Sequence, residues 1–187
     1  MKKFFVILFL IAGVVSCKEG AKDNAENKKA AVKDPRNPAN ETEENIYRSA
    51  DSMMSAFKNK DWATFANYSH PAMIKMMGGQ EAFVKLITDQ MQQIPDTAIK
   101  SIGVGKIMQV VKTDQDQQCV VEQNMLMELQ GMRITSTTYL VGESLNGGKS
   151  WTFFDASNGG VVKPKDLKPN LSPEIKVPEK KQDMKQM

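Results

Sequence analysis

Residues 119–129, Cys-Val-Val-Glu-Gln-Asn-Met-Leu-Met-Glu-Leu, decide the fold of this chain. Successive side chains of a β-strand point to opposite faces, so apolar residues at every second position predict a strand with one buried and one wet face. Such a strand needs partner strands and a second layer over its apolar face. The apolar positions are Cys119, Val121, Met125, Met127 and Leu129, and the polar ones between them are Glu122, Asn124 and Glu128.

Three further strand patterns flank this stretch between about residue 97 and residue 156. The first contains Gly103 and Gly105, where we expect a bend or bulge because glycine weakens a regular strand. The second, Ile134 to Val141, is rich in β-branched residues, and the third follows an Asn-Gly-Gly hairpin turn at 146–148. Turns separate all four strands, so this order predicts an antiparallel meander.

Helical patterns occupy residues 41–95, ahead of the strands. Asn40 and Asp61 are suited to cap the first and second helices. Pro71 favours the first turn of a third helix, and the Gly-Gly pair at 78–79 should end it. We therefore expect an α+β fold in which N-terminal helices pack on a bent, four-stranded antiparallel sheet.

The helices and strands together resemble small secreted domains of the NTF2-like (cystatin-like) family. The resemblance rests on Phe-Lys-Asn-Lys-Asp-Trp at 57–62, Tyr-Ser-His-Pro at 68–71 and the last hairpin, and it covers about residues 43–156. The chain departs from the fuller family pattern because no strand pair is evident before the fourth helix. The resemblance implies a cavity between a helix and the concave sheet face. The family includes enzymes, carriers and assembly modules, so the fold alone does not give the function.

The cavity implied by this resemblance is the expected functional site. The sequence contains no zinc spacing, phosphate-binding loop or catalytic triad, and no cofactor is expected. The leading hypothesis is therefore a non-catalytic module that binds a small apolar ligand or an envelope protein. The alternative is an isomerase- or hydratase-like enzyme that uses the only histidine as acid or base. The candidate cavity residues are Trp62, Phe65, His70, Met125 and Met127.

The methionines, 13 in number, support a second alternative. Met73, Met76 and Met77 lie near His70, and Met125 and Met127 are two residues apart. Soft Cu(I) sites use such thioether spacings. Methionine also fills irregular cores and adaptable pockets, which is the other interpretation of both groups.

Residues 144–151, Ser-Leu-Asn-Gly-Gly-Lys-Ser-Trp, resemble the Asp-box hairpin of sialidase-type propellers. Asn146 stands where aspartate is usual, and Ser150 where threonine is usual. Propellers require repeats at a fixed period, and this chain has one copy. We therefore expect a self-stabilised hairpin and no glycosidase.

The N-terminus predicts where the protein is located. Two lysines precede an apolar run over residues 4–15, which is shorter than the roughly 20 residues of a membrane span and fits a signal peptide. The run ends in Val14-Val15-Ser16-Cys17, which resembles the lipobox of bacterial lipoproteins. The resemblance implies cleavage after residue 16, acylation of Cys17 and a lipid anchor. Lys18 is not the aspartate that retains some lipoproteins in the inner membrane, so by analogy we expect the outer membrane.

These patterns divide the chain into four regions: a signal peptide at 1–16, a lipidated cysteine and disordered tether at 17–40, an α+β domain at 41–162, and an extended tail rich in proline and lysine at 163–187, frayed at its end. The chain without its signal has nearly balanced charge, which gives no support for nucleic-acid binding. The NTF2-like resemblance also implies that a homodimer can form through the open sheet face, with the β-branched strand Ile134 to Val141 as its surface.

Overall fold

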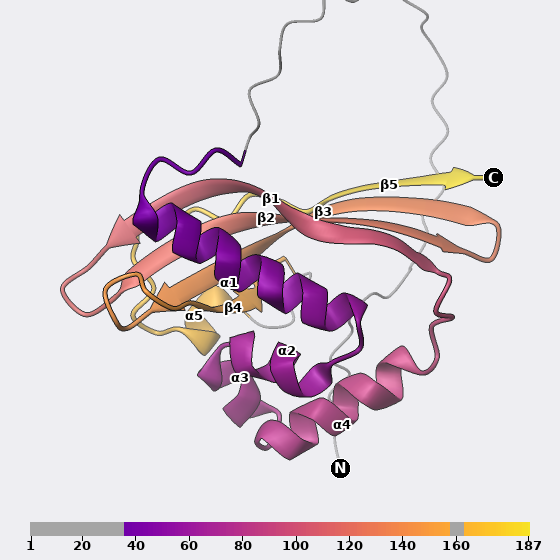
Figure 1. The fold of residues 1–187 in the computed structure, drawn as a ribbon, viewed down its shortest axis with the longest axis horizontal. Helices are drawn as coiled ribbons and strands as arrows, with labels where there is room; N and C mark the ends of the chain where they lie inside the picture. The colour runs from indigo at the N-terminus through magenta and orange to yellow at the C-terminus, as the bar shows by residue number, and fades with distance from the viewer. Residues whose placement is uncertain (1–35, 158–162) are drawn as a thin grey trace, which may run out of the picture.

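The computed structural model describes residues 36–157 and 163–187 (Figure 1). The expected signal segment, Cys17 and most of the expected tether lie outside the described residues. The expected α+β order, with helices before strands, is confirmed. The helices are α1 Glu41–Lys58, α2 Trp62–Tyr68, α3 Pro71–Met76, α4 Gln80–Met91 and α5 Pro164–Leu167, and the strands are β1 Ile99–Lys112, β2 Gln117–Leu129, β3 Met132–Ser144, β4 Thr152–Asp155 and β5 Lys181–Gln186.

The first helices begin and end at the capping residues and glycines predicted from the sequence. The side chain of Asn40 accepts a hydrogen bond from the Glu43 N–H at 3.1 Å, and that of Asp61 accepts one from Thr64 at 3.0 Å. Each bond satisfies a backbone donor that the first helical turn leaves without an internal partner. Gly79, with φ of 103°, separates α3 from α4 in a conformation that favours glycine. Among the described helices, none combines the length and apolar character that crossing a bilayer requires.

The sheet has five antiparallel strands, one more than expected. Strands β1 to β4 follow one another in sequence order, and β5 pairs with residues 132–137 of β3. The short strand β4 pairs only with residues 140–143, so the rest of that β3 edge is open to β5. The prediction that the tail frays at its end is therefore wrong, because its last residues form this fifth strand.

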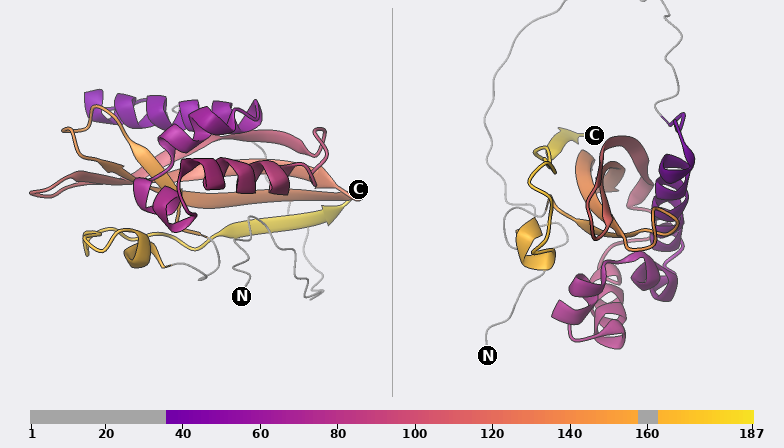
Figure 2. Two further views of the ribbon diagram at one scale, coloured as in Figure 1. Left: turned by 90° about the horizontal axis from the view of Figure 1, so that it is seen from below. Right: turned by 90° about the vertical axis from the view of Figure 1, so that its left-hand side faces the viewer.

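Strand β1 is irregular where its glycines predict a bulge. Its register against β2 shifts between Val104 and Ile107. A Cβ atom added at Gly105 would lie 2.8 Å from Glu122 Cβ, so glycine allows the two strands to approach closely here. Bulges bend the strand that carries them, and Figure 2 shows β1 curling over the end of the sheet.

The inner face of the sheet packs against α1, α2 and α4, with α1 lying along the strands (Figure 1). Met53 and Met54 of α1 pack with Val121 and Leu140 in one apolar cluster. Ala72 and Met73 of α3 pack against the apolar cluster of the outer face.

The predicted alternation of β2 is confirmed for its inner face, where Cys119, Val121, Met125 and Met127 are buried and Leu129 is half-buried. The expected wet face is wrong at Gln118 and Val120, which are buried as well, whereas Asn124 is exposed.

The outer face of the sheet is covered by the chain itself. We call residues 163–180 the strap. Leu167 and Ile175 of the strap pack on Tyr139 and Val141 of β3. The segment 134–141, which was expected to form an open surface, is therefore mostly buried within one molecule. The homodimer itself stays a prediction.

The hairpin at 144–151 stabilises itself, as its Asp-box-like sequence predicts. Asn146 Oδ1 accepts hydrogen bonds from the Ser144 hydroxyl at 2.9 Å and the Ser150 N–H at 3.0 Å, while its Nδ2 donates to the Ser150 hydroxyl. The indole of Trp151 donates to the Gly148 carbonyl at 3.1 Å from beneath the turn. One asparagine thus fixes the turn through three hydrogen bonds.

A glycine on the inner face provides a test of core packing. A Cβ atom at Gly142 would lie 2.6 Å from Cys119 Sγ and 2.7 Å from the Phe153 ring. We expect Gly142→Ala to lower the free energy of unfolding by about 1–3 kcal/mol through overpacking. Gly103→Ala is the matched control, because a Cβ there meets nothing within 4 Å. Urea unfolding measures both variants, and an equal loss in the two would contradict this explanation.

Candidate functional site

Two of the five candidate cavity residues fill the core between helices. The Trp62 ring centroid lies 5.6 Å from that of Phe57 and 6.3 Å from that of Phe65. Phe65 in turn stacks on Phe83 of α4 at 6.3 Å. These rings pack against one another, so they hold α1, α2 and α4 together.

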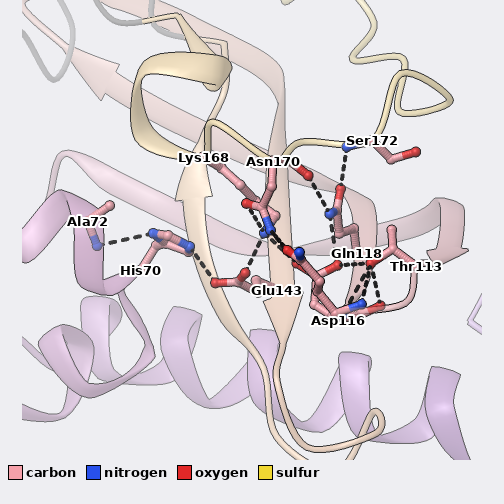
Figure 3. Close-up of polar contacts among 10 residues, drawn as sticks. His70, Ala72, Thr113, Asp116, Gln118, Glu143, Lys168, Asn170 and Ser172 are labelled. Atoms are coloured by element: carbon pink, nitrogen blue, oxygen red, sulfur yellow. Dashed lines mark hydrogen bonds and ion pairs between the residues drawn. The ribbon is translucent and has the colours of Figure 1, made fainter.

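His70 has a structural role at the start of α3. Its Nδ1 accepts a hydrogen bond from the Ala72 N–H at 3.2 Å, which places the ring proton on Nε2. Nε2 donates that proton to Glu143 Oε2 at 2.8 Å (Figure 3). The residue is 5% exposed, and its ring meets Phe154 edge-on. Both ring nitrogens are engaged inside the fold, which disfavours the hypothesis of an acid or base acting on a substrate.

A buried ion network next to His70 was not predicted from the sequence. The Lys168 side chain is 1% exposed, and its ammonium donates to Asp116 Oδ2 at 2.5 Å and to Asn170 Oδ1 at 3.0 Å. It also donates to Glu143 Oε1, whose other oxygen accepts from His70 (Figure 3). A lysine has three donors, so this ammonium is fully satisfied. The network joins the β1–β2 turn, the end of β3, the start of α3 and the strap.

Asp116 is held ionised in this network. Burial opposes ionisation, but hydrogen bonds from Lys168, Thr113 and Gln118 outweigh it and lower the pKa of Asp116 to about 2. The Thr113 hydroxyl donates to Asp116 Oδ1 at 2.7 Å, and Gln118 Nε2 donates to the same oxygen at 2.9 Å. The contacts of this carboxylate are with groups of the protein itself. We call the network of His70, Asp116, Glu143, Lys168 and Asn170 the clasp, because it holds the strap to the sheet.

The inner face carries a second feature, a row of polar side chains between apolar clusters. Gln123 lies opposite Thr138, and Met125 lies opposite Ser136, in adjacent positions of β2 and β3. Thr138 Oγ1 donates to Gln123 Oε1 at 3.3 Å. Ser136 is 2% exposed, and its hydroxyl has no hydrogen-bond partner within residues 36–157 and 163–187. An unpaired buried hydroxyl lowers the stability of a fold by about 1–3 kcal/mol. Stability alone therefore does not explain a serine at position 136, and a role in binding would.

The remaining candidates lie near this row. Met125 is part of it, and Met127 packs two positions further on with Ala98 and Ile134. Ser136 was not predicted, because a serine within a β-branched strand gives no sign of which face it occupies until the register is known.

Some of the methionines considered as copper ligands pack in the core. Met73 and Met77 pack against the aromatic cluster of α1, α2 and α4, whereas Met76 is 46% exposed. Within 36–157 and 163–187, no group of three or more histidine, cysteine, aspartate or glutamate side chains could hold a metal ion.

A shallow depression of about 540 Å³ lies over α2, α3 and the start of α4. Lys75, Asn67 and Gln80 contribute polar groups to its lining, and none of the five candidate cavity residues takes part. The depression and the polar row are therefore separate features.

No protein-family model matches the chain, and no curated protein matches it in sequence. The NTF2-like resemblance therefore rests on the motifs at 57–62 and 68–71 and on the last hairpin.

The low pKa of Asp116 predicts a loss of stability in acid. The folded value of about 2 lies below the ordinary 3.8, so the ionised group stabilises the protein above pH 4 and loses this effect as pH falls towards 2. Urea unfolding between about pH 5 and pH 2 should show a free energy of unfolding that falls about 2 kcal/mol more in wild type than in Asp116→Asn. Asp114→Asn, an exposed carboxylate in the same turn, is the control and should behave as wild type.

Proposed function

We propose that this protein is a lipid-anchored lipoprotein of the bacterial cell envelope whose inner sheet face binds a small apolar ligand without catalysis. The observation that carries the proposal is the buried Ser136 hydroxyl, which has no hydrogen-bond partner among the described residues and lies on a face between two apolar clusters. Ligand sites are mostly apolar and contain a few polar groups that orient the ligand. A row of three polar side chains between two apolar clusters has this composition.

The polar row supports a specific ligand chemistry. Thr138 and Gln123 hydrogen-bond to each other, so the Ser136 hydroxyl is the group left to recognise a ligand. A hydroxyl both donates and accepts, and it suits an alcohol or a carbonyl group. Met125, directly opposite, offers a flexible thioether that adapts to the apolar part of the ligand.

The acid–base groups of the domain support a non-catalytic role. His70, Glu143 and Asp116 are all bound to one another or to Lys168. A general acid or base must reach the proton that it transfers, and these groups are buried in the clasp beneath the strap.

The described part of the chain begins in contact with α1. Arg36, the first described residue, lies with its guanidinium 5.1 Å from the centre of the Tyr47 ring and pairs with Asp51. These contacts hold the chain to α1 at the point where the tether predicted from the sequence enters the domain. The lipid anchor itself is inferred from the lipobox at 14–17.

Native mass spectrometry of residues 18–187, made in a bacterial periplasm, tests ligand binding. We expect the wild type to retain a small molecule as added mass, and Ser136→Val to lose it because the hydroxyl is gone. Thr135→Val is the matched control, since the neighbouring Thr135 is exposed and points to the other face. A wild-type spectrum with no added mass would overturn the ligand proposal and favour protein–protein assembly.

Intact-mass analysis of the full-length product tests the anchor separately. We expect the mature chain to begin at Cys17, to carry acyl chains and to fractionate with membranes. Cys17→Ser should remove the acyl mass and release the protein from membranes, because the thiol of the lipobox is lost. A chain of unmodified mass that begins elsewhere would contradict the lipoprotein assignment without affecting the ligand test.

A further inference from the structure

The strap is held to the sheet by glutamine side chains that contact its backbone. Gln118 Nε2 of β2 donates to the Asn170 carbonyl at 3.1 Å, and Gln118 Oε1 accepts from the Ser172 N–H at 2.8 Å. The amide therefore bonds the carbonyl of one residue and the N–H of the residue two further on, as a neighbouring strand would.

A second glutamine repeats this arrangement four residues along the strap. Gln109 Nε2 of β1 donates to the Glu174 carbonyl at 3.2 Å, and its Oε1 accepts from the Lys176 N–H at 2.8 Å. These four bonds involve only the backbone of the strap, so they bind an extended segment whatever its side chains.

The side chains of the strap add specificity to these contacts. Lys168 enters the acidic site formed by Asp116 and Glu143, and Leu167 and Ile175 pack on the apolar outer face. After the strap, β5 adds main-chain pairing along β3. Backbone hydrogen bonds that give affinity and side-chain sites that give specificity are the features of a peptide-docking surface.

The opposite edge of the sheet is poorly suited to strand pairing with another molecule. Strand β1 carries register shifts and three exposed lysines, Lys100, Lys106 and Lys112. Bulges and lysines on an edge strand prevent association with other strands. The outer face and the β3 edge are therefore the better assembly surface.

We propose that the outer face is a peptide-docking site and that the C-terminal segment 163–187 of a second copy occupies it, so that two copies exchange these segments. Every copy of the protein contains the segment 163–187 that fits this face. The positive charge of Lys168 in that segment complements the carboxylates of Asp116 and Glu143. Exchange of a terminal element reproduces the same contacts between molecules, which makes it a low-cost route to a dimer. Docking of the segment on its own chain competes with docking on a second copy. The exchanged fraction should therefore increase with the local concentration of the protein.

Disulfide trapping tests the exchange. Thr135 of β3 and Asp183 of β5 are register partners, and both are exposed. Two differently tagged chains of residues 18–187, one with Thr135→Cys and one with Asp183→Cys, are mixed over a range of concentrations and oxidised. We expect a disulfide between the two tags whose yield rises with protein concentration. Cys119 should not interfere, because it is fully buried and burial raises the pKa of its thiol.

Two controls make the result decisive. Gln182→Cys replaces Asp183→Cys in the first, because Gln182 is equally exposed but faces the other side of the sheet, and its yield should be several-fold lower. The second is a single chain with both Thr135→Cys and Asp183→Cys, which should cross-link within itself. Cross-linking within that chain but not between tags would overturn the exchange, and failure of both would overturn the docking site as well.

Discussion

The buried ammonium of Lys168 is the interaction on which the C-terminal half of the structure depends. An ion removed from water must be matched by partners, and removing one partner of such a pair typically costs 3–5 kcal/mol. The partners of Lys168 come from the β1–β2 turn, the end of β3 and the strap itself. Because Glu143 also accepts from His70, the start of α3 is fixed by the same charge.

The two faces of one strand pair serve two different purposes. In β2, Cys119 and Val121 face the helices, whereas Gln118 and Val120 face the strap. The two-residue period of a strand allows this, because each face can be composed independently of the other. The inner face combines apolar clusters with the Ser136 hydroxyl, which is unsatisfied among the described residues, whereas Gln118 and Val141 on the outer face contact the strap.

The sequence alone predicts features that depend on residues close together in the chain. The caps at Asn40 and Asp61, the alternation in β2 and the 144–151 hairpin all follow from a few adjacent residues. The clasp could not be predicted, because Lys168 and Asp116 are 52 residues apart and a lysine among prolines is expected in water. Strand β5 was missed because its charged sequence resembles a frayed end. The cavity residues stay a prediction, and Trp62 and Phe65 show that aromatic character alone does not distinguish core packing from a site.

The placement of the chain ends has a mechanical consequence. The first turn of α1 and the last residues of β5 lie at opposite ends of the sheet (Figure 1). Strand β5 runs antiparallel to β3, and its last residues pair beside the β2–β3 turn. A force applied between the two ends of the domain would therefore pull β5 along its own axis. Its hydrogen bonds to β3 would bear that force together, in shear, and would not open one after another.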